Sequence, residues 1–289
     1  MKGPDRFVDL HLHTNASDGL TSPEEMVRLA QEKNLAAIAI TDHDSLEGFK
    51  EALHIAEETG IEIIPGVELS CFHQGEDLHI LGYLVDYENP EFVREIAHLQ
   101  VERFERGKRM VQKLNELGIN LSMDAVIDFA GEGSLGRPHI AEALVQQEYV
   151  PTYREAFVRY IGYHAPAYVP KKFMNPEEGI NLIHSNGGVA ILAHPGTNHR
   201  DDLIPDLVGV GLDGLEAYHH SYAHHTTVKY INMAQKFGVI YTGGSDCHGA
   251  RGGRILIGCN KVPYVCLENL RRVKEERQSK QLRGEADKR

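Results

Sequence analysis

The stretch FVDLHLHTNASD, residues 7–18, carries an apolar strand-like run directly into two histidines and an aspartate. Side chains alternate along a strand, so His11 and His13 share one face, where both imidazoles can bind the same ion. Asp18 follows in a short loop. This pattern predicts a polar site at the carboxyl end of the first strand.

Working outward, short apolar runs alternate with helix-like segments. Strands are predicted over residues 7–10, 36–40, 61–69, 78–85, 189–193, 214–217 and 239–241. Ser22 before Pro23 and Asn175 before Pro176 are typical of helix starts, and Gly60 is typical of a helix end. Repeated β and α units favour a parallel sheet or barrel, in which the carboxyl ends of the strands share one face.

Residues 90–172 break this repeat, because they are mostly helical and charged. We interpret them as a helical insertion that caps the substrate site of a barrel formed by residues 1–89 and 173–266. Residues 267–289 form a charged C-terminal tail, which is predicted to begin as a helix and to fray into disorder.

Composition narrows the functional classes. The 289 residues have a formal net charge of -12, so nonspecific attraction to nucleic acid or anionic membranes is not expected from the chain alone. No apolar run is long enough for a membrane span, and the four cysteines show no disulfide framework. A cytoplasmic protein without membrane association is expected. The 17 histidines matter most, because histidine is the commonest metal ligand.

More of these residues lie at or near the carboxyl ends of the later strands. They are Asp42, His43 and Asp44, then Glu68, then His79, then His194, and finally Asp246 and His248. Any single histidine is more often a hydrogen-bonded or surface residue than a ligand. Seven histidines are therefore expected on the surface, on a helix face or in support of the ligands: His54, His98, His184, His219, His220, His224 and His225. The set as a whole differs, because burying so many unpaired charges costs several kcal/mol unless metal ions or partners compensate.

The motifs HLHTNASDG, ITDHDSLEG, PGVELS, HILGY, RPHIAEALV, LAHPG and GGSDCHG, spread over residues 9–249, resemble the polymerase and histidinol phosphatase (PHP) superfamily of phosphoesterases. Within it, the inserted helical region and the GRPHIA motif resemble the nucleoside 3',5'-bisphosphate phosphatases, some of which also act on RNA 5' ends. The resemblance implies an α/β fold, a distorted (β/α)7 barrel with an inserted, mostly helical domain.

The resemblance also implies three divalent metal ions. His11, His13, Glu68 and Asp246 would hold the first ion, Glu68, His79 and His194 the second, and Asp18, His43 and His248 the third. Imidazole and carboxylate donors without thiolate suit manganese, iron or zinc, and manganese is favoured here. Imidazoles bind metal only when neutral, so metal affinity is expected to weaken below about pH 6.5.

The expected reaction is attack of a metal-activated water on a phosphate monoester of a small nucleotide, with 5'-to-3' trimming of short RNA as a second activity. His194, His248 and Asp246 are the catalytic candidates. Arg137, His139 and Arg200 are the candidates for substrate binding, since a guanidinium can clamp a second phosphate. Lys171, Lys172, Arg251 and Arg254 are further possibilities, with solvated surface charge favoured for the lysines.

One departure from the family pattern bears on the substrate. Some relatives place a lysine shortly before the segment that matches residues 166–169, where this chain has Tyr163, His164 and Ala165. Two alternatives therefore stay open: hydrolysis of histidinol phosphate or another small phosphate ester, and a non-catalytic, metal-stabilised binding module. The sequence leaves the oligomeric state open.

Overall fold

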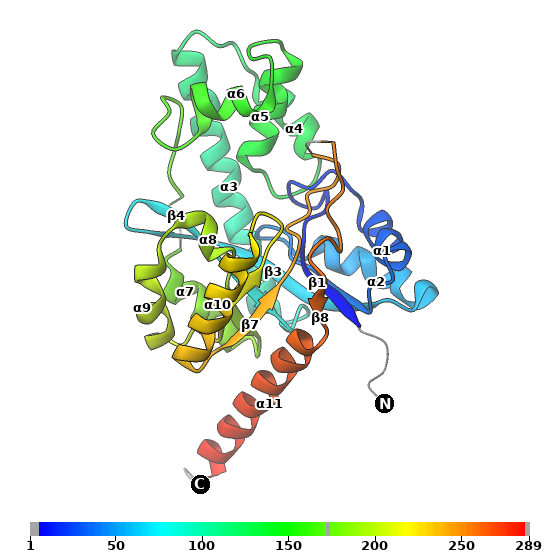
Figure 1. Ribbon diagram of the computed structural model, residues 1–289. Coiled ribbons are helices and arrows are strands. Elements are labelled where there is room, and N and C mark those ends of the chain that lie inside the picture. The colour runs from blue at the N-terminus through cyan, green and yellow to red at the C-terminus, as the bar shows by residue number, and fades with distance from the viewer. Residues whose placement is uncertain (1–5, 172–173, 252, 287–289) are drawn as a thin grey trace.

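The computed structural model describes residues 6–171, 174–251 and 253–286, and within them the strands form one eight-stranded, nearly closed barrel (Figure 1). The sheet order is β7-β6-β5-β4-β3-β2-β1-β8. The strands are β1 Phe7–Leu12, β2 Ala37–Ile40, β3 Glu62–His73, β4 Glu76–Tyr83, β5 Val189–Leu192, β6 Gly214–Tyr218, β7 Ile240–Gly243 and β8 Val262–Pro263. The predicted α/β barrel is confirmed.

The prediction of an all-parallel sheet is wrong around β4. This strand is antiparallel to both β3 and β5, while β1, β2 and β3 are parallel, as are β5, β6 and β7. A two-residue turn causes the reversal: Gln74 and Gly75 have φ of 49° and 97°, the left-handed pair that joins antiparallel strands. His79 therefore does not lie near the carboxyl end of its strand. It pairs with Ser70 of β3 and reaches the site from the hairpin.

Helices around the barrel begin where the sequence predicts. Helix α1, Pro23–Glu32, is capped by Ser22, whose side chain accepts from the Glu25 amide, and α7, Pro176–Ser185, starts with a capping box of Asn175 and Glu178. The other helices of the barrel part are α2 Glu47–Thr59, α8 Pro195–Asn198, η2 Asp201–Leu203, α9 Ile204–Gly209 and α10 His224–Phe237.

Between β4 and α7 the chain forms the helices that stand at one end of the barrel in Figure 1. They are α3 Pro90–Glu116, α4 Met123–Ala130, α5 Arg137–Gln146, α6 Tyr153–Ala156 and the π-helix η1 Phe157–Ile161. These helices bury their own apolar cluster, which includes Met110, Leu114 and Ile140. The boundaries of the insertion at residues 90 and 172 remain a prediction.

A buried arginine ties this helical segment to the barrel. The Arg103 guanidinium on α3 donates to the Asp44 carboxylate and, at 2.5 Å, to Ser70 Oγ. Asp44 follows β2 and also accepts from the Ser70 amide at 2.8 Å. A buried charge pair of this kind fixes orientation, because neither charge can leave its partner without a large desolvation cost.

The C-terminal segment is more ordered than its composition predicts. Helix α11 runs over Val265–Ala286, and Figure 1 shows it projecting away from the barrel. Its first turns bury Cys266, Leu267 and Leu270 against strand residues such as Val8 and Tyr83. Packing of this apolar edge holds the helix in place although ten of its 22 residues are charged. Among the described residues, no helix is long and apolar enough to cross a membrane.

Truncation of Leu270 to alanine should reduce the free energy of unfolding by about 2–5 kcal/mol, because this fully buried side chain would leave a cavity against the barrel. Leu282 on the same helix is 69% exposed, so Leu282→Ala should change stability by less than about 0.5 kcal/mol. Urea denaturation followed by circular dichroism measures both. Equal, small effects would show that α11 does not pack as described.

Candidate metal centre

The predicted ligands converge on one site although they come from six different strands or the loops that follow them. His11 lies in β1, Glu68 in β3 and His79 in β4. The others lie in loops: His13 and Asp18 after β1, His43 after β2, His194 after β5, and Asp246 and His248 after β7. The close approach of the last loop requires Gly244, because a Cβ there would lie 2.3 Å from His11 Cβ.

Glu68 lies at the centre of the cluster and is fully buried. Its Oε1 lies 2.8 Å from His79 Nδ1 and 3.0 Å from His194 Nε2. Its Oε2 lies 2.9 Å from His43 Nδ1 and 3.2 Å from His13 Nε2. One carboxylate therefore faces four imidazoles, the position that a bridging ligand would occupy.

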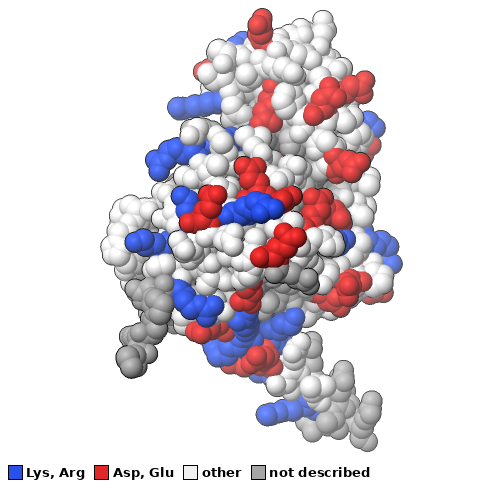
Figure 2. Space-filling view, turned by 90° about the vertical axis from the view of Figure 1, so that its right-hand side faces the viewer, with Lys and Arg blue, Asp and Glu red and all other residues white. Residues whose placement is uncertain are grey.

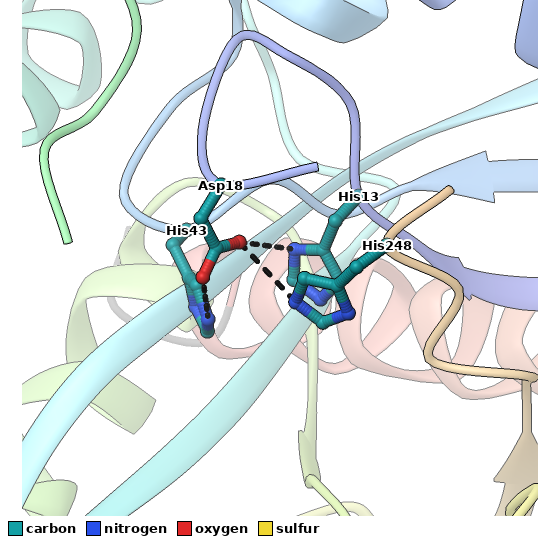
Figure 3. Close-up of side chains that lie close together, drawn as sticks. All are labelled: His13, Asp18, His43 and His248. Carbon is teal, nitrogen blue, oxygen red and sulfur yellow. Dashed lines mark ion pairs between the residues drawn. The ribbon is translucent and has the colours of Figure 1, made fainter. Parts of the chain in front are cut away.

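Figure 3 shows a second group, in which His13, His43 and His248 surround Asp18. Their potential ligand atoms all lie within 4.8 Å of one another. Asp18 Oδ1 is 3.2 Å from His248 Nε2, and Asp18 Oδ2 is 3.9 Å from His43 Nε2. The predicted trio of Asp18, His43 and His248 is thus brought together, with His13 as an additional neighbour.

The remaining candidates complete the centre. His11, His13 and Asp246 form one compact group, and His43, Glu68 and His79 form another. His11 Nε2 and His13 Nε2 are 3.0 Å apart, and His13 Nε2 is 3.2 Å from Asp246 Oδ1. The side chains predicted for the first and second ions are therefore adjacent, and they share Glu68.

Divalent cations suit the chemistry of these donors. Within the described part of the chain, His13 Nδ1, Asp18 Oδ1, His43 Nδ1 and Glu68 Oε2 are buried and make no well-aligned hydrogen bond, although three of them lie close to an oppositely charged group. Buried polar atoms are normally paired, and leaving each unpaired costs about 1–3 kcal/mol. Hard oxygen and imidazole nitrogen donors that point at one another satisfy this need by binding a cation. The cluster therefore fits metal ions.

Burial and neighbouring charges lower the pKa of some histidines of the cluster and raise the pKa of others. Burial lowers the pKa of His43 to about 3 and that of His79 to about 4. Burial acts in the same direction on His13, but hydrogen bonds to Asp246 and Glu68 outweigh it and raise its pKa to about 10. The pKa of His11 is also raised, because the charges of Glu216, Asp246 and Glu68 overcome the effect of burial.

Glu216 on β6 is a site residue that the sequence analysis missed. It is fully buried, its Oε1 lies 2.9 Å from His11 Nδ1, and its Oε2 accepts from the His194 amide at 2.7 Å. The interaction leaves His11 Nε2 facing the cluster. A carboxylate commonly orients a metal-binding imidazole in this way. An acidic residue inside the otherwise apolar strand GLEAY was the available signal. His219, expected on the surface or in support of the ligands, contacts Asp246 Oδ2 at 3.2 Å.

The predicted substrate residues lie in different surroundings. Arg137 is 3.4 Å from Asp77 Oδ2, with its side chain 16% exposed. His139 is buried and its Nδ1 accepts from the Gly136 amide, so it caps α5. Arg200 pairs with Asp202 and Glu76. Substrate binding by these three residues stays a prediction.

Among the further candidates, the surface reading of Lys171 is wrong. Lys171 is 5% exposed, and its Nζ lies 3.1 Å from His79 Nε2 and 3.2 Å from Ser70 Oγ. A lysine at a segment boundary carries no sequence signal of burial, so the sequence could not indicate this position. Lys172 lies outside the described residues. Arg251 donates to Glu142 at 2.6 Å and to the Asp18 carbonyl.

Comparisons with known proteins agree with this geometry. The PHP domain model matches residues 9–166. A 5'-3' exoribonuclease of Haemophilus influenzae is 35% identical over 83% of this chain and 89% of its own length. A 3',5'-nucleoside bisphosphate phosphatase of Chromobacterium violaceum is 30% identical over 90% of this chain and 93% of its own. A structure from Bifidobacterium adolescentis described as a metal-dependent phosphoesterase superimposes with a TM-score of 0.84, at 29% identity, over 93% of this chain and 96% of that one.

The fold and the His, Asp and Glu cluster define a metal-dependent phosphoesterase. The chain belongs to the PHP domain family.

Glu216→Gln should weaken metal affinity about 10- to 100-fold, because the amide keeps the shape but removes the charge behind His11. Glu62→Gln is the matched control, since Glu62 pairs with Arg271 at the opposite end of β3. Competition with a fluorescent chelator measures both. An unchanged affinity in Glu216→Gln would remove the supporting role assigned to this carboxylate.

The structure predicts that metal binding weakens at a higher pH than the value of about 6.5 expected from the sequence. A histidine whose pKa is raised to about 10, as for His13, keeps its proton at pH 7, and the proton must leave before the nitrogen binds metal. Apparent affinity should therefore rise from about pH 6 to about pH 9, by up to about tenfold per pH unit for each proton displaced. Calorimetry in two buffers of different ionisation enthalpy counts the protons released. Affinity independent of pH, with no proton release, would contradict the assignment.

Proposed function

We propose that this enzyme hydrolyses a phosphate monoester of a small nucleotide of the 3',5'-bisphosphate type, and that it trims short RNA from the 5' end with the same site. The observation that carries the proposal is the combination of the metal centre with cationic side chains beside it. Lys171 contacts His79, and Arg137 is joined to Lys171 through Asp77, which lies 3.4 Å from Arg137 Nη2 and 4.0 Å from Lys171 Nζ. Two relatives act on substrates of these two kinds, as their names state.

The metal centre is proposed to hold three divalent ions, manganese in preference to iron or zinc, through the ligands predicted from the sequence. Several imidazoles are oriented for this role by a second contact. His248 Nδ1 lies 2.9 Å from the Asp246 carbonyl, so it donates there and leaves Nε2 as the ligand atom near Asp18. Fixing the tautomer from behind in this way is usual at metal sites.

When bound, the ions would supply a nucleophile at neutral pH from water and neutralise the charge of the phosphate oxygens. The chain's own part is to position these components. Glu68 holds His79 and His194 on one carboxylate oxygen, and His219 holds the outer oxygen of Asp246. His194, His248 and Asp246 act mainly as ligands in this proposal. His194 could transfer a proton only through a ring nitrogen that holds no metal, and its Nδ1 lies 3.2 Å from Thr197 Oγ1.

Arg137 and Lys171 are proposed to bind the second phosphate of the substrate. Burial lowers the pKa of Lys171 to about 8, which leaves it largely protonated at neutral pH. On the face shown in Figure 2, basic side chains are interspersed among acidic ones. Long nucleic acids need an extended basic surface, so this face and the formal net charge of -12 favour small nucleotides and short oligonucleotides.

The two alternatives are less well supported. Histidinol phosphate would use the same metals but would need neither Arg137 nor Lys171. A non-catalytic binding module does not require the complete cluster and is not favoured by the phosphatase and exoribonuclease relatives. The cytoplasmic location remains a prediction from the sequence.

Phosphate release should be fastest from adenosine 3',5'-bisphosphate, slower from adenosine 5'-monophosphate and slowest from histidinol phosphate. Arg137→Ala should lower kcat/KM for the bisphosphate by about 10- to 100-fold, because a desolvated charge-assisted contact contributes about 1.5–3 kcal/mol. Its effect on the monophosphate should be smaller. Malachite green assays of metal-loaded protein provide the rates.

Glu68→Ala serves as the negative control, since removal of the central carboxylate should abolish hydrolysis of every substrate. Equal wild-type rates on all three esters would refute the nucleotide assignment. Full activity of Glu68→Ala would refute the metal centre itself.

A further inference from the structure

A cavity of about 420 Å³ opens beside the metal centre, and the proposed reaction leaves it unused. Its walls come from the β3–β4 hairpin, the loop after η1 and helix α8. The lining side chains that matter are those of Gln74, Asp77, Tyr163, His164, Thr197 and Asn198. The volume falls in the range of small-molecule sites, about 300–1,000 Å³.

Two contacts join this cavity to the metal centre. On one side, Thr197 Oγ1 lies 3.2 Å from His194 Nδ1. On the other, Asp77 lies 4.0 Å from Lys171 Nζ, which is itself 3.1 Å from His79 Nε2. A ligand with its phosphate at the metals therefore has the rest of its structure within reach of the cavity.

Tyr163 gives the cavity an aromatic wall. Its side chain remains 47% exposed, and the Arg137 guanidinium lies over the ring at 4.9 Å from the centroid. An exposed aromatic ring that is backed by a guanidinium is a platform on which a flat heterocycle stacks. The same arginine can then contact a phosphate of the ligand.

The polar groups on the walls complement the edge of a nucleobase. Gln74 Oε1 accepts from Arg200 and Asn198 Oδ1 accepts from Thr197, so both amides present their NH2 groups as donors. These two amides therefore offer hydrogen-bond donors to the ring nitrogens and carbonyl oxygens on the edge of a base.

We propose that this cavity is the subsite for the nucleoside part of the substrate, with the base stacked on Tyr163 and its edge read by Gln74 and Asn198. The inference rests on the proposed function, because it places the substrate phosphate at the metal centre. It adds the claim that the enzyme recognises a base, which a general phosphatase acting on sugar phosphates has no need to do.

Calorimetric titration of the metal-loaded protein with the methylene phosphonate analogues of adenosine 5'-monophosphate and ribose 5-phosphate tests this claim. A methylene group in place of the bridging ester oxygen prevents hydrolysis, and the two ligands differ in carrying a base or a hydroxyl group at C1'. Wild-type protein should bind the nucleotide analogue more tightly. Tyr163→Ala should weaken nucleotide binding about 5- to 150-fold, the range of base stacking on an aromatic side chain. The same variant should change binding of the ribose 5-phosphate analogue less than about twofold, and Tyr163→Phe, which keeps the ring, should bind both ligands as wild type does.

Two outcomes would overturn the subsite. One is equal binding of both ligands by wild-type protein. The other is equal weakening of both by Tyr163→Ala, which would show that the ring only supports Arg137. Because binding is measured without turnover, the result is independent of the hydrolysis assays. A nucleotide whose analogue binds through Tyr163 but which is not itself hydrolysed would refute the proposed function and leave the base subsite in place.

Discussion

The buried carboxylate of Glu68 is the constraint on which the rest of the structure depends. Four imidazoles from separate parts of the chain lie within about 3 Å of its oxygens, and water does not reach it. Such a concentration of desolvated polar groups is unfavourable by itself, since unpaired buried charge costs several kcal/mol. Bound cations would pair with these donors and remove the cost, so the burial of the donors favours metal binding. The barrel can therefore be understood as a frame that holds these donors at one end.

The frame keeps the donors in place through contacts behind them. Glu216 orients His11 and holds the backbone at His194, while Asp9 accepts from the amides of Ser245 and Gly258 and so fixes the last ligand loop. Burial raises the pKa of Asp9 to about 6, although these backbone hydrogen bonds favour its charged form. Rigid support of this kind decides metal affinity as much as the ligands do, because a misplaced imidazole loses its bond to the ion.

In the proposed function, the helical segment between β4 and α7 contributes cationic and aromatic side chains to substrate recognition, next to the polar side chains of the barrel. Arg103 anchors α3 to Asp44 and Ser70 next to the centre, so the residues beyond it are held at a fixed distance from the metals. Arg137, Tyr163 and Lys171 all come from this part of the chain or its return to the barrel. A common hydrolytic centre combined with a separate recognition segment explains how one family can act on different phosphate esters.

The sequence by itself determined the strands, the capped helices and the identity of the residues that meet at the centre. Alternation along a strand and the pairing of His11 with His13 are local properties, and a local pattern is visible in the chain. The reversal of β4, the burial of Lys171, the support from Glu216 and the cavity beside Tyr163 were decided only by tertiary structure. Each depends on which distant segment packs against which, for example the hairpin turn at Gln74 and Gly75 that brings His79 back beside Glu68. No spacing along the chain encodes such a contact, because its energy arises only when both partners lose their water together.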